Sequence, residues 1–209
     1  MNTCIQIFGY DVGDVLWRNS RRVVYRVTRL SDGVACILET IDAQYPDRDL
    51  VIGLRRESVI TQQLSDIDGI KKIHHVLPHG SGNLAVVSEF YDCTLEQLLA
   101  QSNRQGLPLS QVLEIALSLV DTIGYLHQRD IVHKAIAPQH ILLNKSTGAI
   151  ALSGLTIASE LSQELQPIQL PKQCEDTLPY MSPEQTGRMN RDLDYRSDYY
   201  SLGILLFEL

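Results

Sequence analysis

The sequence predicts an α+β fold of two lobes, a small antiparallel β lobe followed by a helical lobe. Two observations favour this fold. The first third of the chain is rich in β-branched and aromatic residues divided by turn signals, whereas from Thr94 onward the apolar residues recur at helical spacing. We expect residues 1–91 to form the first lobe and residues 92–209 the second, with a link near Glu89 to Asp92.

A β-hairpin and a helix are the main elements expected in the first lobe. Val23–Val27 and Val34–Leu38 have the composition of strands, and the turn signal Ser31-Asp32-Gly33 separates them. Asp47–Leu64 has the apolar spacing of a helix, and Leu84–Val87 is a further short strand. The helix positions expected to face inward are Leu50, Ile60 and Leu64.

Helices dominate the expected second lobe. Thr94-Leu95-Glu96-Gln97 fits a capping box, in which the Thr hydroxyl and the Gln side chain each bond the other residue's backbone N–H. Ser110 is a candidate N-cap for a longer helix, and a further helix is expected from near Ser197. The apolar residues expected on the inner face of the longer helix are Leu113, Leu117, Val120, Ile123 and Leu126.

Between these helices the sequence indicates a second hairpin and a loop. Ile141–Leu143 and Ile150–Leu152 are short apolar runs, and the polar residues 144–148 between them are typical of a turn. The segment Ser159–Thr177 is rich in Gln, Pro and Ser, so we expect an irregular loop there.

Composition bounds the function classes. The 209 residues are 44% hydrophobic and 21% charged, which is ordinary for one globular domain. The formal net charge of −7 argues against a nucleic acid or an anionic membrane as partner, because such partners require a basic surface. No uninterrupted apolar run approaches the roughly 18 residues that span a bilayer.

Cysteine usage points to a reducing compartment. The four cysteines lie far apart without a CxxC pair, so we expect free thiols, no zinc site and a cytoplasmic location. We find no basic region followed by an apolar stretch at the N-terminus, and hence expect no signal peptide. His74, His75 and His79 could suggest a metal site, but no acidic or Cys partner accompanies them, and we favour a polar loop.

Three blocks carry a resemblance to a known family. Ile131–Asn144 resembles the protein-kinase catalytic loop, His-Arg-Asp-x-x-x-x-Asn followed by an apolar strand. Thr177–Glu184 is similar to the end of a kinase activation segment, with Ser-Pro-Glu in place of Ala-Pro-Glu. Tyr195–Gly203 resembles the start of the buried helix of the large lobe. The resemblance covers roughly residues 10–209 and implies the bilobal protein-kinase-like fold.

A narrower resemblance lies in Glu184–Arg191. This segment is similar to the N-terminal serine/threonine-kinase-like domain of very large bacterial signalling proteins, in which an ATPase module, GAF domains and often a histidine kinase follow. Because Ile204–Leu209 reads as an apolar helix at the end of the sequence, we expect a helical lobe that is incomplete at its C-terminus. The resemblance implies partners among the other domains or proteins of a signalling system.

The nucleotide-binding positions implied by the resemblance lack their usual charges. Glu39 stands at the position of the Lys that pairs with the α- and β-phosphates, and the sequence has no Lys before Lys71. Glu57 stands at the position of the helix glutamate that grips this Lys, so we expect it to face Glu39 as a repulsive pair. The glycine-rich loop is missing from Leu16–Arg22. The remaining positions of this degenerate site are Ser88, as gatekeeper, Glu89 and Tyr91.

The positions that would carry the phosphoryl-transfer chemistry are also changed. Ala135 replaces the catalytic Asp, His140 replaces the metal-binding Asn, and Gly154 replaces the Asp of the Asp-Phe-Gly motif. No Asp lies between Asp130 and Asp176, so no shift of the alignment supplies one. We therefore expect no metal, and no cofactor at all unless the alternative below holds.

The residues that hold this fold together in the family are retained. By the resemblance, His133, Pro183, Glu184 and Asp198 link the catalytic loop, the activation segment and the central helix. Retained scaffold beside lost chemistry predicts a pseudokinase, a regulatory or protein-interaction domain without phosphotransfer.

Two alternatives stay open. The chain could be an atypical serine/threonine kinase that binds ATP and Mg²⁺ with charges placed elsewhere, for which the arginines of the first strands are candidates, although an exposed strand face is the simpler reading. These arginines are Arg18, Arg21, Arg22, Arg26 and Arg29. It could also be a decayed or split gene product without a function of its own.

Overall fold

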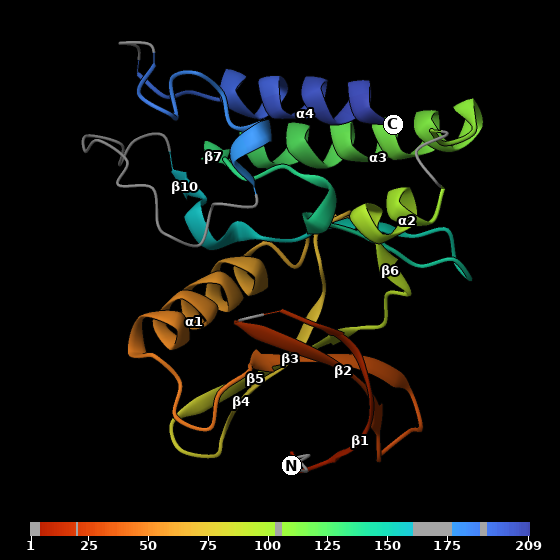
Figure 1. Ribbon diagram of the computed structural model, residues 1–209, viewed down its shortest axis with the longest axis vertical. Coiled ribbons are helices and arrows are strands. Elements are labelled where there is room, and N and C mark those ends of the chain that lie inside the picture. Colours follow the sequence, from red (N-terminus) through yellow and green to blue (C-terminus); the bar gives the residue numbers. More distant parts are fainter. Residues whose placement is uncertain (1–4, 20, 103–105, 161–176, 189–191) are drawn as a thin grey trace. The chain divides into compact units, whose positions relative to one another are not determined.

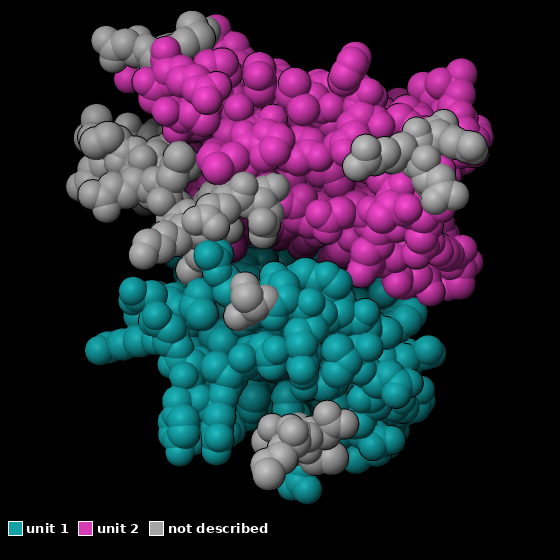
Figure 2. Space-filling model, viewed as in Figure 1, with its two compact units in different colours: residues 1–66, 71–91 teal, residues 67–70, 92–209 magenta. Residues whose placement is uncertain are grey.

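A computed structural model of the chain describes residues 5–19, 21–102, 106–160, 177–188 and 192–209. It divides into two compact units, shown in different colours in Figure 2. Unit 1 contains Met1–Asp66 and Lys71–Tyr91, and unit 2 contains Ile67–Ile70 and Asp92–Leu209.

Unit 1 is built on a five-stranded antiparallel sheet of order β1-β2-β3-β5-β4 (Figure 1). The strands are β1 (Tyr10–Arg18), β2 (Arg22–Arg29), β3 (Ala35–Ile41), β4 (Ile73–His79) and β5 (Asn83–Glu89). The predicted hairpin is β2–β3, and the predicted strand near residues 84–87 is β5, so both predictions are confirmed. The α+β class is confirmed as well. The two edge strands β1 and β4 were not predicted, because neither shows a regular alternation of apolar and polar residues.

Helix α1 (Arg48–Gln63) confirms the helix predicted for unit 1. It begins after Asp47, whose side chain accepts a hydrogen bond from the backbone N of Asp49 at 2.9 Å and so caps the first turn. Of the positions expected to face inward, Leu64 is buried, whereas Leu50 and Ile60 are half-buried. The buried residues of the helix itself are Leu54, Glu57, Ser58 and Thr61.

The sheet of unit 1 packs a separate apolar cluster on each face, because successive side chains of a strand point to opposite sides. One cluster contains Ile7, Tyr10, Val27, Cys36, Leu38, Ala85 and Val87. The other contains Ile41, Leu54, Leu84 and Val86 and includes helix α1. Glu39 alternates with Leu38 along β3 and therefore lies on the α1 face, which brings it to the same side of the sheet as Glu57.

Among its described residues, unit 2 contains three α-helices. In α2 (Leu95–Gln101), the capping box at Thr94 is confirmed, since the Thr94 hydroxyl accepts from the N of Gln97 and the Gln97 side chain accepts from the N of Thr94. The longest helix, α3, is Leu109–His127. The prediction that Ser110 caps it is wrong. Pro108 occupies the N-cap position with a φ of −55, close to the value that its ring imposes, so the helix begins before Ser110.

The inner face of α3 was predicted only in part. Ile123 and Leu126 are buried, as expected, but Leu113, Leu117 and Val120 are about half exposed. The helix is apolar around most of its circumference, so spacing alone does not select one face. The residues that the structure buries are Ile115, Leu119, Thr122, Ile123 and Leu126. Among the described residues, α3 alone is long and apolar enough to cross a membrane, a test that the core helix of a globular protein also passes.

Short strands complete unit 2. The predicted hairpin is confirmed as β8 (Ile141–Leu143) and β9 (Ile150–Leu152), which form a three-stranded sheet with β6 (Cys93–Thr94). Of the segment predicted as a loop, Ser159–Glu160 is strand β10, which pairs with β7 (Ile131–Val132). Residues 161–176 of that segment lie outside the described residues.

The last helix, α4 (Arg196–Glu208), confirms the helix predicted near Ser197 and lies beside α3 in unit 2 (Figure 1). Two single turns of 3-10 helix, η1 (Pro138–His140) and η2 (Leu155–Ile157), precede it in the chain. They flank the β8–β9 hairpin; His140 is the last residue of η1, and Gly154 directly precedes η2.

Candidate functional site

The first half of the candidate site lies in unit 1, around Glu39. In the sheet, Glu39 pairs with Val24 of β2 and Val86 of β5, in the middle of the α1 face. Ser88 pairs with Ile37, two residues along β3 from Glu39, so both side chains lie on this face.

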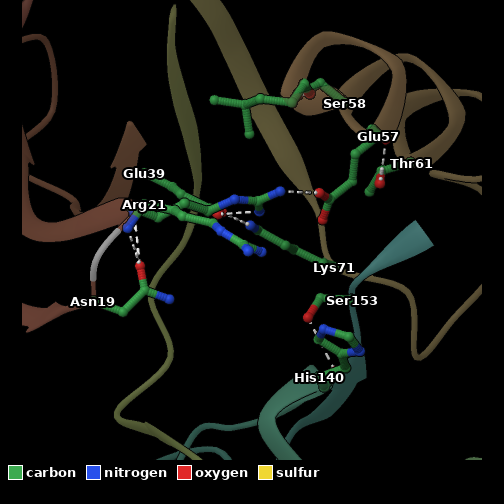
Figure 3. A network of polar contacts seen from close by, with 11 residues as sticks. Asn19, Arg21, Glu39, Glu57, Ser58, Thr61, Lys71, His140 and Ser153 are labelled. Atoms are coloured by element: carbon green, nitrogen blue, oxygen red, sulfur yellow. Dashed lines mark hydrogen bonds and ion pairs between the residues drawn. The ribbon is translucent and has the colours of Figure 1, made fainter. Parts of the chain in front are cut away.

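Glu39 and Glu57 are joined by cations. One guanidinium nitrogen of Arg22 contacts Glu39 at 2.5 Å and another contacts Glu57 at 3.0 Å. The Nζ of Lys71 contacts the second oxygen of Glu39 at 2.8 Å, as Figure 3 shows. The expectation of a repulsive pair without a cation is therefore wrong. We call Arg22, Glu39, Glu57 and Lys71 the ion cluster.

Sequence reasoning missed both contacts because it looked for a lysine at the position of Glu39 and did not anticipate cations from other segments. Arg22 comes from the start of the neighbouring strand β2, and Lys71 lies after α1 at the entrance to β4. Both reach Glu39 only because the sheet and the helix bring distant segments together. The signal present in the sequence was weak, since five arginines lie in and around the first two strands and nothing distinguishes Arg22 among them.

The ion cluster is largely shielded from water. The exposed fractions of the side chains are 12% for Glu39, 9% for Glu57, 9% for Lys71 and 26% for Arg22. Burial by itself would raise the pKa of Glu39, but the charges of Lys71 and Arg22 outweigh it and hold this pKa well below its usual range. Burial would lower the pKa of Arg22, but Glu57 and Glu39 outweigh it and raise this pKa. Glu39 and Arg22 are therefore ionised at neutral pH.

The side chain and backbone of Asn19 bond the backbone of Arg21 and Arg22, at the start of β2. The Oδ1 of Asn19 accepts hydrogen bonds from the backbone N of Arg21 at 2.8 Å and of Arg22 at 2.7 Å. The N of Asn19 donates to the carbonyl of Arg22 at 2.9 Å. These bonds fix the backbone from which Arg22 reaches Glu39 and Glu57 (Figure 3).

Arg18, Arg26 and Arg29 do not share partners with Arg22. Arg18 pairs with Asp42 at 3.1 Å, Arg29 pairs with Asp32 at 3.0 Å, and Arg26 lies 4.9 Å above the ring centre of Phe90. Each of these three arginines, like Arg22, thus has partners of its own. A common phosphate-binding surface made from all of the strand arginines thus finds no support in these contacts.

The other expected nucleotide positions lie at the end of β5. Ser88 is fully buried, Glu89 is exposed, and Tyr91 is buried with 4% of its surface exposed. The Tyr91 hydroxyl donates to the Glu89 carboxylate at 3.4 Å. Burial, and then the charge of Glu89, raise the pKa of Tyr91 to about 12.

The second half of the candidate site lies in unit 2, where Asp198 of α4 anchors the catalytic-loop segment. The Asp198 carboxylate accepts hydrogen bonds from the N of His133 at 2.9 Å and from the N of Lys134 at 2.8 Å. It also contacts the Nε2 of His127 at 2.8 Å. Lys134 has a φ of +66, and these bonds hold that left-handed backbone conformation in place. Sequence reasoning did not connect His127 with this carboxylate.

His133 connects the same segment to the end of β9. Its Nε2 lies 2.9 Å from the carbonyl oxygen of Ser153, and its Nδ1 accepts from the N of Ala135 at 3.2 Å. This pattern assigns a neutral imidazole with its proton on Nε2. His133 is fully buried, in keeping with the structural role that the resemblance implied.

Glu184 connects the segment 177–188 to α4, and Pro183 bonds within the segment. Glu184 accepts a hydrogen bond from the Ser197 hydroxyl at 2.8 Å, and the carbonyl of Pro183 accepts from the N of Arg188 at 3.0 Å. The neighbouring Gln185, which sequence reasoning did not assign a role, donates to the carbonyl of Lys134 at 2.8 Å. Amides and hydroxyls thus fasten this segment to the catalytic-loop segment and to α4.

The three chemically changed positions lie together in unit 2. The Nδ1 of His140 contacts the carbonyl oxygen of Ala135 at 2.6 Å, and the His140 ring covers the α-carbon of Gly154. Their side chains are a methyl group, an imidazole and a hydrogen atom. Only the imidazole could bind a metal, and a neutral nitrogen is a poor ligand for Mg²⁺, which prefers oxygen. This set of side chains does not fit the two-metal site of a kinase.

Comparisons with known proteins agree with this arrangement. The sequence profile of the protein kinase domain matches residues 19–209, and the chain belongs to this family. A probable serine/threonine-protein kinase of Streptomyces coelicolor is 29% identical over 96% of the chain, and histidine protein kinase 1 of Candida albicans is 25% identical over 76%. The STE20-related kinase adapter protein strd-1 of Caenorhabditis elegans is 29% identical over 55% of the chain.

These relatives are much longer than the chain. It spans 30% of the Streptomyces protein, 6% of the Candida protein and 30% of the Caenorhabditis protein. The likeness is thus to a part of each relative, and the match to the protein kinase domain confirms the kinase fold and the family resemblance.

Proposed function

We propose that this chain is a pseudokinase-type domain that serves as a regulatory or protein-interaction module of a signalling protein and has lost phosphotransfer. The observation that carries the proposal is the ion cluster. In a kinase, a lysine of β3 is paired with the helix glutamate and left available to the phosphates. Here Glu39 reverses the charge at that position, and the cations beside it are already bonded to carboxylates.

The electrostatic cost of binding a triphosphate follows from this pairing. Arg22 and Lys71 contribute two positive charges, Glu39 and Glu57 two negative charges, and the ion cluster has a formal charge of zero. A phosphate about 4 Å from Glu39 would be repelled by about 4 kcal/mol at an effective dielectric constant of about 20. Drawing one cation away would instead break a largely buried ion pair from one side, which costs about 3–5 kcal/mol.

The chemistry of unit 2 supports the same proposal. Ala135 cannot orient a substrate hydroxyl, and neither Gly154 nor His140 offers the oxygen ligands that Mg²⁺ requires. Each factor of ten in rate corresponds to about 1.4 kcal/mol of transition-state stabilisation. Positioning and electrostatic stabilisation are the main contributions of a kinase active site, and the side chains that would supply them are replaced.

A binding role is supported by what the chain retains. The ion cluster ties α1 to the sheet, and Asp198 and His133 hold the catalytic-loop segment. One relative bears the name of a kinase adapter protein, which is a non-catalytic role. We infer that the partners are other domains or proteins of a signalling system in the cytoplasm, where Cys36 and Cys93 stay free thiols. The net charge of −7 disfavours nucleic acids and anionic membranes as partners.

Transfer of γ-phosphate from radiolabelled ATP to generic protein substrates tests the proposal, and we expect no transfer above background. A thermal-unfolding titration with ATP, with and without Mg²⁺, is expected to give no shift up to millimolar nucleotide. The variant Lys71→Ala separates the chain from a contaminating kinase, because only transfer by the chain itself can respond to it. Transfer that a competing ATP analogue abolishes and that Lys71→Ala changes would refute the proposal.

The second candidate function, an atypical serine/threonine kinase that binds ATP and Mg²⁺, rests on one specific observation. Lys71 and Arg22 are two cations beside the usual lysine position, and a nucleotide could recruit them from Glu39. This candidate predicts a rise in the unfolding midpoint with ATP that Lys71→Ala abolishes. Absence of any rise in the unmodified chain excludes it.

A further inference from the structure

The strongest observation outside the ion cluster is the contact between His140 and Gly154 in unit 2. Gly154 has a φ of +83, and a β-carbon built on it would lie 2.5 Å from Cγ, 2.6 Å from Nδ1 and 2.7 Å from Cδ2 of His140. Non-bonded carbon atoms pack at about 3.5–4.0 Å. Any side chain at position 154 therefore overlaps the part of the imidazole ring that is attached to the β-carbon of His140, and not only the tip of the side chain.

The ring cannot give way easily, because His140 is held at both its side chain and its backbone. Its Nδ1 contacts the carbonyl of Ala135 at 2.6 Å, and its N donates to the carbonyl of Ala137 at 2.9 Å. Its own carbonyl accepts from the N of Ser153 at 2.8 Å and from the Ser153 hydroxyl at 3.0 Å (Figure 3). Moving the ring away from Gly154 would break the bond to Ala135.

We propose that the imidazole of His140 fills the place of the metal-binding carboxylate of a kinase domain and thereby excludes divalent cations from unit 2. The three replaced residues then pack against one another. The carbonyl of Ala135 anchors the ring, His140 occupies the volume, and Gly154 provides the space for it. This inference goes beyond the proposed function, because it identifies a steric closure by a named side chain in addition to the missing negative charge.

The backbone at position 154 does not by itself explain the glycine. Asp enters the left-handed region more readily than most residues, so a φ of +83 would not exclude the carboxylate found in active kinases. Gly148 offers a matched control in the same unit, with a φ of +72 and no atom within 4 Å of a β-carbon built there. A substitution at Gly148 reports backbone strain alone, whereas one at Gly154 reports strain plus the collision.

A double-mutant cycle tests the packing. Gly154→Asp, His140→Ala, the double variant and Gly148→Asp are made in the full chain, and their midpoints of thermal unfolding are compared. We expect Gly154→Asp to lower the midpoint by on the order of 5 °C more than Gly148→Asp does, and His140→Ala to remove most of that excess. If Gly154→Asp does not fold, the smaller change Gly154→Ala, with Gly148→Ala as control, completes the same cycle. The proposal would be overturned if the substitution at Gly154 lowered the midpoint equally in the presence and absence of the His140 side chain. It would also be overturned if that substitution lowered the midpoint no more than the matching one at Gly148 does.

Metal binding is measured separately with Mn²⁺ alone, from the loss of the free-ion paramagnetic resonance signal. The variant Gly154→Asp combined with His140→Asn is expected to bind Mn²⁺ at least about tenfold more tightly than Gly154→Asp alone, since a tenfold change is about 1.4 kcal/mol. Equal affinities would overturn the claim that His140 closes the site. Neither readout depends on phosphotransfer, so failure of this inference is distinguishable from failure of the proposed function.

Discussion

Replacement of Arg22 by Ala tests the ion cluster most directly, because Arg22 contacts both carboxylates. The substitution removes the 2.5 Å contact with Glu39 and the 3.0 Å contact with Glu57 and leaves the 2.8 Å contact between Lys71 and Glu39. Breaking a buried ion pair from one side costs about 3–5 kcal/mol. Since 26% of the Arg22 side chain is exposed, water relieves part of this cost, and we expect a loss of about 2–3 kcal/mol.

Thermal unfolding of Arg22→Ala measures this loss, and Arg18→Ala is the matched control. Arg18 contacts Asp42 at a similar distance of 3.1 Å, but the exposed fractions of the two side chains are 53% and 31%. Exposed pairs contribute about 0–1 kcal/mol. For a chain of this length, a loss of about 1 kcal/mol lowers the midpoint of thermal unfolding by roughly 2–4 °C. We therefore expect Arg22→Ala to lower the midpoint by about 4–12 °C and Arg18→Ala to lower it by less than about 4 °C.

The pH dependence of this difference follows from the pKa of Glu39. The ion cluster lowers this pKa in the folded chain, so its stabilising effect is fully present above the unfolded pKa, about 4.5, and is lost as the pH falls toward the folded pKa. The gap in stability between the unmodified chain and Arg22→Ala should therefore be widest near neutral pH and narrow below about pH 4.5. Equal midpoints for the two Arg variants, or a gap that widens on acidification, would refute the reasoning.

Three further predictions concern other contacts. Glu39→Lys raises the formal charge of the ion cluster from zero to +2, because one of two negative charges is lost and a third positive charge is added. The variant should therefore bind inorganic triphosphate, and the ligand should raise its midpoint of thermal unfolding but not that of the unmodified chain. Gly69→Ala, whose β-carbon would overlap the Thr122 hydroxyl at a φ of +84, should cost about 3 kcal/mol or more in denaturant unfolding, against about 1 kcal/mol for Gly148→Ala. Asp198→Asn should cost about 3 kcal/mol in the same assay, because a buried carboxylate that accepts three hydrogen bonds becomes an amide that matches fewer of them; a loss below about 1 kcal/mol would contradict its anchoring role.

The elements that sequence analysis predicted are those specified by local signals. The β2–β3 hairpin has a turn signal and β-branched strands, and the helix at residues 95–101 has both halves of its capping box in four consecutive residues. The inner face of α3 was mispredicted at Leu113 and Leu117 because both sides of this helix are apolar. Its orientation is set by packing with segments distant in sequence, among them Gly69, over which Thr122 fits closely.

The candidate site was predictable where a motif fixes the position and unpredictable where partners come from other segments. Glu39 and Glu57 were found from the resemblance, and the structure places both on the α1 side of the sheet. Their cations, Arg22 and Lys71, belong to no motif, and a side-chain contact between residues far apart in the chain leaves no local pattern. The same holds for His140 and Gly154, which were recognised as separate losses but not as one packed contact.

The way in which the lost residues are replaced distinguishes a maintained domain from a decaying one. Random replacement of a lysine by Glu39 would leave two carboxylates facing each other, at a cost of several kcal/mol in a partly buried place. Instead, Arg22 and Lys71 neutralise both. Throughout the part of the chain that the structure describes, no buried side-chain nitrogen or oxygen lacks a hydrogen-bond partner. A decaying gene would not be expected to restore such pairing. An uncompensated buried group lowers stability, but in a chain without function nothing selects against that loss. The compensation therefore favours a maintained fold over a decaying one, as the proposed binding role requires.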